Sequence, residues 1–209
     1  MMKKYKKTLT LTSVIILLPI VIGLIFWNRL PDTIATHFGS DNVANGWSSK
    51  PFVVFGMPAV MLLLHWVCAA ATMNDPKKKN ISDKMFRVIL WIVPVISLLT
   101  LSMTYMNALG IAVNIGMVTN LLMGVVFIII GNYLPKCKQN YTAGIRIPWT
   151  LHSEENWNRT HRLAGWLLLL GGILFLINAF LLSEMMLIVI MALVFVPAVY
   201  SFFLFKKGI

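Results

Sequence analysis

The sequence is poor in acidic residues and in cysteine. Only 7 of its 209 residues are Asp or Glu, and all of these lie between its apolar segments or at their ends. The buried carboxylates with which many ion-coupled transporters carry protons are therefore missing. His65 is the only candidate proton carrier inside an apolar segment, and we interpret it as a hydrogen-bonded interior side chain. The two cysteines, Cys68 and Cys137, are not expected to form a structural disulfide, because we place Cys137 in the reducing cytosol.

Six long apolar runs dominate what the sequence does contain. Each has about 18 to 23 residues, which at ~1.5 Å of rise per helical residue matches a hydrocarbon core of roughly 30 Å. The runs are 9–26, 51–73, 88–107, 111–133, 163–182 and 185–205. The sequence therefore predicts an all-α fold, a polytopic integral membrane protein with a bundle of six transmembrane helices.

Positive charge is confined almost entirely to one side of these runs. Of the 18 Lys and Arg residues, all except Arg29 and Lys50 precede the first run, follow the last run, or lie in the second and fourth connections. Short loops rich in Lys and Arg stay in the cytoplasm during insertion, so both termini are expected to be cytoplasmic. We predict an N-terminal two-helix region, 1–75, with an ordered extracytoplasmic loop 27–50. A four-helix region, 76–209, follows, with a cytoplasmic loop 135–162.

The net charge of +11 has a topological explanation. Basic residues spread over four cytoplasmic segments anchor helices and attract anionic headgroups, and no segment interleaves basic and aromatic residues as nucleic-acid surfaces do. Membrane lipids are the expected partners, and direct nucleic acid binding is not expected. Small and polar residues of the fourth and fifth runs, such as Gly124, Gly172 and Asn178, favour close helix packing over a transport path.

The extracytoplasmic loop is too long and too mixed in composition for a simple connection. Ile34 and Phe38 would share a face if this stretch forms a helical turn. Asn45-Gly46 is a tight-turn signal that brings Trp47 to the membrane interface. The charges of the loop cancel, so a ligand there would be held by shape and apolar contact. The alternative is an ordered cap that closes the outer end of the bundle.

The cytoplasmic loop carries a dense set of polar side chains, and we expect most of the function there. Ser153 is a good helix cap, with Glu154 and Glu155 in the first turn, where carboxylates suit the positive end of the helix dipole. The helix that begins there can continue directly into the fifth run. On this helix Glu155 can form an ion pair with Arg159.

No catalytic or metal site is predicted in this loop. His152 and His161 are nine positions apart, whereas the usual helical zinc proteases need two histidines four apart. Cys137 lies between two lysines and is expected to be a somewhat acidified thiol, but no base accompanies it. We therefore expect no enzyme, metal or cofactor. A structural interpretation stays open, in which Trp149 and Trp157 anchor the loop at the headgroups and its arginines bind phosphates.

These two loops resemble those of the SdpI family of bacterial membrane proteins. The family pattern is a Gly-Asn at the end of a helix, an Asn, GIR-x-PWT, a Trp and a Thr-His-Arg. The matching residues are Gly131, Asn132, Asn140, Gly144, Ile145, Arg146, Pro148, Trp149, Thr150, Trp157, Thr160, His161 and Arg162. The outer loop resembles a domain of unknown function that often accompanies this family. Its matching residues are Pro31, His37, Phe38, Gly46, Trp47 and Lys50.

The resemblance implies an immunity protein in the bacterial cell membrane. The namesake protein protects its producer from a secreted hydrophobic killing peptide and, when the peptide is present, holds a transcriptional repressor at the membrane. We therefore expect resistance to an antimicrobial peptide, with signal transduction through a cytoplasmic repressor as the finer hypothesis. Phe38 and Trp47 are expected to contact the peptide. The residues expected to form or support the repressor-binding surface are Arg146, Trp149, Trp157, His161 and Arg162.

Three alternatives remain at this stage. One is a small transporter, and another is an intramembrane enzyme, each with its polar site in the cytoplasmic loop 135–162. The third is a stress-related membrane protein with lipid-binding arginines that shares the fold and not the activity.

Overall fold

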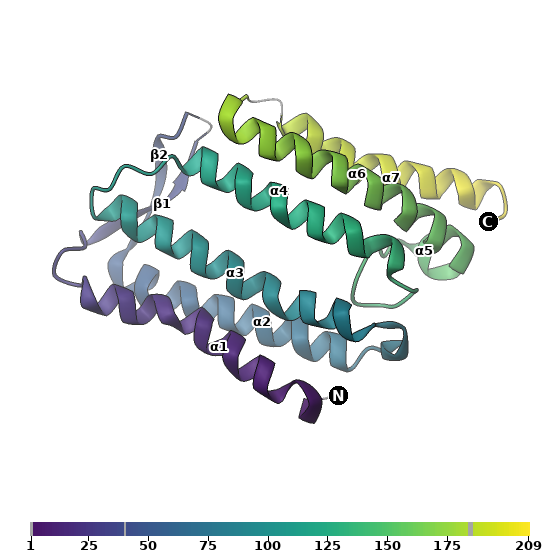
Figure 1. Ribbon diagram of the computed structural model, residues 1–209, viewed down its shortest axis with the longest axis horizontal. Coiled ribbons are helices and arrows are strands. Elements are labelled where there is room, and N and C mark those ends of the chain that lie inside the picture. Colours follow the sequence, from purple (N-terminus) through teal and green to yellow (C-terminus); the bar gives the residue numbers. More distant parts are fainter. Residues whose placement is uncertain (1, 40, 184–185) are drawn as a thin grey trace. The chain divides into compact units, whose positions relative to one another are not determined.

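The computed structural model describes residues 2–39, 41–183 and 186–209. Within these ranges six helices are long and apolar enough to cross a membrane, which confirms the six-helix prediction (Figure 1). They are α1 (Met2–Ile25), α2 (Met57–Met73), α3 (Asp83–Ala108), α4 (Ile115–Tyr133), α6 (Glu154–Leu181) and α7 (Met186–Lys206). The predicted start of the sixth run, Met185, lies outside the described residues.

Shorter elements lie between these helices. They are the strands β1 (Thr33–Phe38) and β2 (Ala44–Ser49), a π-helical turn η1 (Phe52–Gly56), the 3-10 turns η2 (Lys78–Asn80) and η3 (Leu134–Lys136), and the short helix α5 (Pro148–His152). The turn η1 leads directly into α2, and η3 directly follows α4, so the second and fourth apolar segments are longer than α2 and α4 alone.

The chain packs as two compact units. The N-terminal unit comprises Met1–Met73 and Arg87–Gly116, and the C-terminal unit comprises Asn74–Phe86 and Met117–Ile209. Most of α3 therefore packs with α1 and α2, although it follows them after a basic connection. The predicted division of the chain at residue 75 stays a prediction about sequence regions, whereas these units describe packing.

The N-terminal unit is held together by apolar contacts at one end and by a polar contact between helices. A buried cluster there consists of Leu30, Ile34, Val53, Val54, Leu101 and Tyr105. Farther along the helices, Nε2 of His65 in α2 lies 2.9 Å from the Thr12 hydroxyl of α1, and both side chains are buried. The interpretation of His65 as a hydrogen-bonded interior group is confirmed.

The outer loop forms an antiparallel β-hairpin, so the prediction of a helical turn is wrong. β1 and β2 pair with Thr33 opposite Ser49 and Ala35 opposite Trp47, and Figure 1 shows the hairpin at the end of the N-terminal unit where α1 ends. The segment TIATHF contains β-branched residues that favour strands, and pairing with β2 satisfies its backbone groups. The Asn45-Gly46 turn prediction is also wrong, because both residues lie within β2 and the chain reverses before them, near Asn42 with its positive φ.

The C-terminal unit packs α4 closely against α6 through glycines. A Cβ on Gly124 would lie 2.9 Å from the carbonyl oxygen of Gly172, and a Cβ on Gly131 would lie 2.8 Å from that of Gly165. Such small residues let helix backbones approach each other in a membrane. The Asn178 side-chain amide also donates to Asn120 Oδ1 at 3.0 Å. The predicted close packing of the fourth and fifth runs is confirmed.

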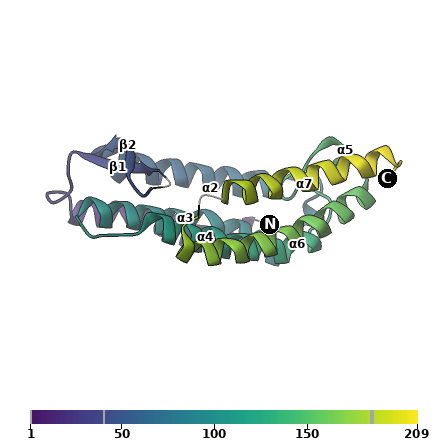
Figure 2. The ribbon, with the colours of Figure 1, turned by 90° about the horizontal axis from the view of Figure 1, so that it is seen from above.

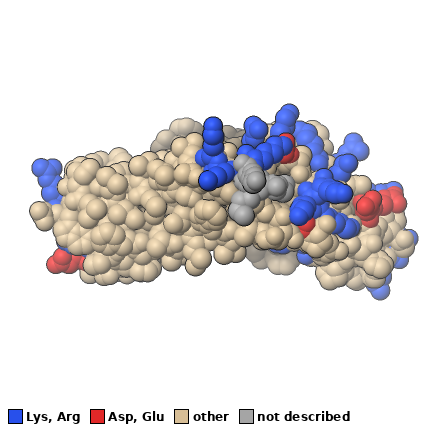
Figure 3. All heavy atoms as spheres, turned by 90° about the horizontal axis from the view of Figure 1, so that it is seen from below, with Lys and Arg blue, Asp and Glu red and all other residues tan. Residues whose placement is uncertain are grey.

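The surface agrees with a membrane environment. Large apolar side chains such as Leu63, Phe180 and Leu187 are exposed on the long helices, where a lipid chain is the natural neighbour. Figure 3 shows wide areas of uncharged surface (tan), with Lys and Arg (blue) in groups. Which side of the membrane each end faces remains the prediction made from the charges.

Candidate functional site

The predicted cytoplasmic loop folds into an ordered structure, here called the motif loop (residues 137–153). It leaves η3, forms α5 and ends at Ser153, whose hydroxyl accepts a hydrogen bond from the Asn156 N–H at 3.2 Å. α6 then runs without interruption through the fifth apolar run. The predicted Glu155–Arg159 ion pair is present at 2.6 Å. The helix cap, the ion pair and the direct continuation of the helix were therefore predicted correctly.

Asn140 organises the first half of the motif loop. Its side chain is fully buried. The amide group donates to the Lys138 carbonyl at 2.8 Å, and Oδ1 accepts from the backbone N–H groups of Thr142 and Ala143 at 2.9 and 2.7 Å. Asparagine is suited to this role because one side chain offers both donors and an acceptor to a tight turn.

Asp75 holds the same turn from a distant part of the sequence. This carboxylate is 2% exposed. Oδ1 accepts from the Lys77 N–H at 2.7 Å, while Oδ2 accepts from the Tyr141 N–H and the Thr142 hydroxyl, both at 2.8 Å. Asp75 was predicted only as one of the acids at the ends of the apolar runs. Its one local signal is a lone Asp two positions before a run of lysines.

Gln139 joins the connection after α2 to α5. Its amide donates to the carbonyl oxygens of Thr150 and Leu151, both at 2.9 Å. Its side-chain oxygen accepts from Lys77, and its own carbonyl accepts from Asn80 at 2.8 Å. The buried Thr150 hydroxyl in turn accepts from the Ile147 N–H at 3.1 Å. The motif loop is therefore tied at both ends by the buried side chains of Gln139 and Thr150, with Lys77 and Asn80 as partly buried partners.

Trp157 and His161 form the floor on which the motif loop rests. Both are fully buried, and their rings stack with centroids 3.9 Å apart. The Trp157 indole N–H donates to the Cys137 carbonyl at 2.7 Å. The prediction that Trp157 anchors the loop in the headgroup region is therefore wrong, because a buried indole needs an internal partner and finds one here.

Both ring nitrogens of His161 are engaged. A backbone carbonyl can only accept a hydrogen bond, so Nδ1 carries the proton that it donates to the Trp157 carbonyl at 2.8 Å. Nε2 then accepts from the Ile145 N–H at 3.0 Å. His161 thus positions the loop backbone, and neither nitrogen is left to act on a substrate in this arrangement.

Gly144 lies against this histidine. Its φ is +112°, a conformation that side chains rarely adopt, and a Cβ would lie 2.4 Å from His161 Nε2. Glycine is therefore required twice, by the backbone angle and by the contact. The structure brings together five of the predicted residues. Asn140, Thr150, Trp157 and His161 are buried, and the exposed Gly144 lies against His161.

The remaining motif residues point elsewhere. Arg146 is exposed, and its guanidinium donates to the Tyr141 carbonyl at 2.7 Å. Pro148 begins α5, and the half-buried Trp149 packs on Phe202 and Phe205 of α7, with ring centroids 5.5 and 6.1 Å apart. These ring contacts hold α5 against the C-terminal end of α7, as Figure 2 shows. Asn132 and Arg162 line a separate groove, described below.

The Cys137 thiol is less acidic than expected. It is buried, and the burial raises its pKa above the ordinary value, although a hydrogen bond from Asn140 opposes this and the nearby Asp75 charge adds to it. The prediction of an acidified thiol is wrong. The flanking lysines do not compensate, because removal of the sulfur from water penalises the thiolate.

In the hairpin, the predicted residues have mainly structural contacts. Lys50 Nζ donates to the Leu30 carbonyl at 2.8 Å and lies 3.1 Å from the Asp32 carboxylate. A Cβ on Gly46 would lie 2.9 Å from that of His37, so Gly46 allows the strands to approach. The other four predicted residues of the outer loop are Pro31, His37, Phe38 and Trp47.

These four differ in exposure. Pro31 is exposed just before β1, and the His37 ring donates through Nδ1 to Asn45 Oδ1 at 2.5 Å. Phe38 is half-buried, whereas Trp47 is 60% exposed. Trp47 is therefore the side chain of the hairpin that is best placed to meet another molecule.

Comparisons with known proteins identify two regions of the chain. Residues 136–204 match the SdpI/YfhL protein family, and residues 14–62 match a domain of unknown function, DUF1648. The immunity protein SdpI of Bacillus subtilis (strain 168) is 27% identical over 195 residues, covering 91% of this chain and 90% of that protein. The chain is a multi-pass bacterial membrane protein that contains a region similar to the SdpI/YfhL family. The motif loop therefore begins the SdpI/YfhL region, and the hairpin lies inside the DUF1648 region.

No solved structure matches the chain significantly. In the described ranges, no group of three or more His, Cys, Asp or Glu side chains lies close enough to hold a metal ion. The two main features of the described structure are a buried polar network under the motif loop and an exposed tryptophan on the hairpin.

Proposed function

We propose that the protein is an immunity protein that gives resistance to a secreted antimicrobial peptide. The observation that carries this proposal is the similarity to the immunity protein SdpI of Bacillus subtilis, which extends over 91% of this chain and 90% of that protein. A similarity of that extent includes both the hairpin and the motif loop. It therefore favours a shared activity over the reuse of one membrane region in another context.

The hairpin is the proposed contact for the peptide. Its large exposed aromatic side chain in the described ranges is Trp47, and Val43, directly before β2, is equally exposed. The charges of residues 27–50 cancel, and Lys50 is already paired with Asp32. Contact with a hydrophobic peptide would then depend on apolar area, to which an exposed tryptophan contributes strongly.

The motif loop is the proposed contact for a cytoplasmic partner. Arg146 offers an exposed guanidinium, and the buried network of Asn140, Trp157 and His161 keeps the backbone around it in one conformation. A planar guanidinium on a rigid loop can bind carboxylates in a specific geometry. We propose that this surface, supported by Trp149, docks a transcriptional repressor when the peptide is bound, with both termini on the same cytoplasmic side.

Expression of the protein in a peptide-sensitive strain tests the first part. A Bacillus subtilis strain without its own SdpI, challenged with the killing peptide of the namesake system, is expected to survive when it expresses this chain. Trp47→Ala is expected to lower the apparent affinity for the peptide about 30-fold, as the loss of a tryptophan worth ~2 kcal/mol at an interface does. Growth is measured against peptide concentration.

The control for that experiment is Trp91→Ala, which removes an exposed tryptophan from α3 of the same unit. This variant is expected to protect as well as the unmodified chain. Killing of cells that contain the unmodified chain in their membrane at normal levels would refute the immunity proposal. Equal protection by both alanine variants would instead remove the hairpin from the mechanism.

Arg146→Ala tests the motif loop. The buried network does not include this side chain, so the protein level and membrane insertion are expected to be unchanged, whereas resistance is expected to be lost. Arg159→Ala is the matched control, because it removes an exposed arginine that is paired within α6. Immunoblotting of membranes and survival under peptide provide the two measurements. Full resistance in Arg146→Ala cells would exclude the motif loop surface from the activity.

A further inference from the structure

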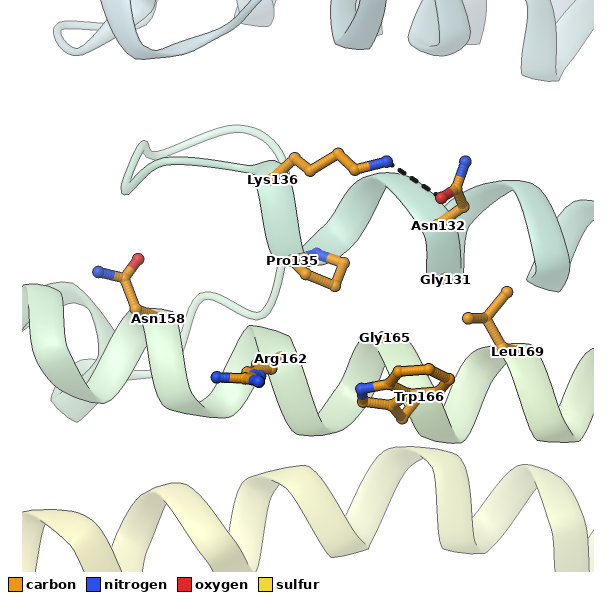
Figure 4. A pocket seen from close by; sticks show the side chains of 9 residues that line it. All are labelled: Gly131, Asn132, Pro135, Lys136, Asn158, Arg162, Gly165, Trp166 and Leu169. Atoms are coloured by element: carbon orange, nitrogen blue, oxygen red, sulfur yellow. Dashed lines mark hydrogen bonds between the residues drawn. The ribbon is translucent and has the colours of Figure 1, made fainter.

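A groove opens beside the motif loop, between the C-terminal end of α4 with η3 and the first turns of α6. Its volume is about 540 Å³, and Figure 4 shows the side chains that line it. They are Gly131, Asn132, Pro135, Lys136, Asn158, Arg162, Gly165, Trp166 and Leu169. All belong to the C-terminal unit. The close approach of α4 and α6 at Gly131 and Gly165 forms its floor.

The groove is positively charged. It contains two cations and no acidic side chain. Arg162 is exposed and has no hydrogen-bond or ion-pair partner in the part of the chain that the structure describes. Lys136 comes from the opposite wall, where it donates to Asn132 Oδ1 at 3.0 Å and lies over the Tyr133 ring. Two cations that lack an acidic partner form a ready site for an anion.

The other half of the lining is apolar and lies deeper along the helices. Trp166, one turn after Arg162, is 62% exposed, and Figure 4 shows it beside Arg162 on α6 with Leu169 beyond it. The apolar part of α6 starts at Leu163, and Lys136 is the last residue of the α4 candidate span. The cations therefore stand where a membrane has its headgroups, and the tryptophan stands at the boundary with the acyl chains.

We propose that this groove binds one anionic phospholipid. The lipid phosphate would lie between Arg162 and Lys136, and the upper part of an acyl chain would lie along Trp166 and Leu169. A soluble anion would use only the charged half of the lining, whereas a neutral lipid would leave the Arg162 charge uncompensated. The proposal goes beyond the immunity function and does not depend on it.

A lipid in this position would connect η3, which precedes the motif loop, to α6, on which the loop packs. Lys136 belongs to η3, which directly precedes the loop, and Arg162 follows the His161 on which the loop rests. An anion shared by both cations would draw η3 toward α6. The lipid would therefore stabilise the loop conformation, which links membrane composition to the exposed Arg146 surface.

The test measures lipid binding to the full-length protein in neutral detergent. Phosphatidylglycerol and phosphatidylcholine are added separately, and bound lipid is counted by native mass spectrometry. We expect phosphatidylglycerol to bind in preference to phosphatidylcholine. Arg162→Gln and Lys136→Gln are each expected to weaken the phosphatidylglycerol adduct about fivefold, which is the contribution of one basic residue near an anionic membrane surface. Arg159→Gln is the control and is expected to bind as the unmodified protein does.

Three outcomes would overturn the proposal. One is equal binding of the two lipids, and another is an equal loss of binding in Arg159→Gln. The third is displacement of phosphatidylglycerol by millimolar inorganic phosphate, which would identify a phosphate site instead of a lipid site. Lys136→Gln changes the opposite wall of the groove, so its phosphatidylglycerol binding tests the proposal even if Arg162→Gln fails to fold. Resistance to the killing peptide is not a readout here, so failure of this proposal and failure of the immunity proposal remain distinguishable.

Discussion

Gly144→Ala is expected to release the motif loop from α6 and to abolish resistance. The new Cβ would lie 2.4 Å from His161 Nε2, and φ is +112° at this position. The Ile145–His161 hydrogen bond, the stacked rings and the turn cannot all be retained. The combined cost of backbone strain and displaced packing is about 3 kcal/mol or more. Hydrogen exchange of residues 137–152 should accelerate strongly, and the midpoint of thermal unfolding in detergent should fall by roughly 10 °C.

Gly110→Ala is the control for backbone angle. Gly110 also has a positive φ, +79°, but no atom lies within 4 Å of the added Cβ. This substitution is expected to cost about 1 kcal/mol and to leave exchange in the motif loop unchanged. If Gly144→Ala behaves no differently from Gly110→Ala, the contact with His161 does not support the loop, and the arrangement described for the site is incorrect.

Asp75→Ala is expected to have an effect of similar size from the other side of the loop. It removes the acceptor of three hydrogen bonds, two from Tyr141 and Thr142 and one from Lys77. A donor left without an acceptor costs up to about 1–3 kcal/mol where it is buried, and less for these partly buried donors. The turn around Asn140 should open, and trypsin should then cleave at the neighbouring Lys138 much faster. Limited proteolysis of the purified protein measures this rate.

Glu154→Ala provides the matched control, since it removes one carboxylate of the same unit from an exposed position in the first turn of α6. Its expected cost is at most about 1 kcal/mol, from the lost interaction with the helix dipole. Cleavage at Lys138 that stays slow in Asp75→Ala would show that Asp75 does not hold the loop.

The six long helices could be predicted from the sequence because the length of an apolar run is a local property. Each apolar run directly predicts a helix. The predicted helix cap at Ser153 and the Glu155–Arg159 ion pair depend only on residues within one or two helical turns. The hairpin was not accessible in the same way. Whether TIATHF forms a strand or a helical turn is decided by its pairing with β2, which lies outside any short window.

The site shows the same division. Motif positions such as Asn140, Gly144 and His161 could be named from the family resemblance, but the pattern did not show that they pack together. Asp75 was missed because it lies 66 positions before Tyr141. Trp157 was predicted to lie in the headgroup region because the local sequence does not distinguish an interfacial tryptophan from a buried one.

The sequence by itself determined six membrane-spanning helices, the start of α6 and the uneven distribution of positive charge, because each follows from hydrophobicity or charge counted along the chain. The tertiary structure alone decided which polar groups are buried and paired. It buried Asp75, Trp157 and His161 under the motif loop, left Trp47, Arg146 and Arg162 exposed, and raised the pKa of Cys137. The physical reason is that burial and hydrogen bonding depend on distances between segments far apart in the chain.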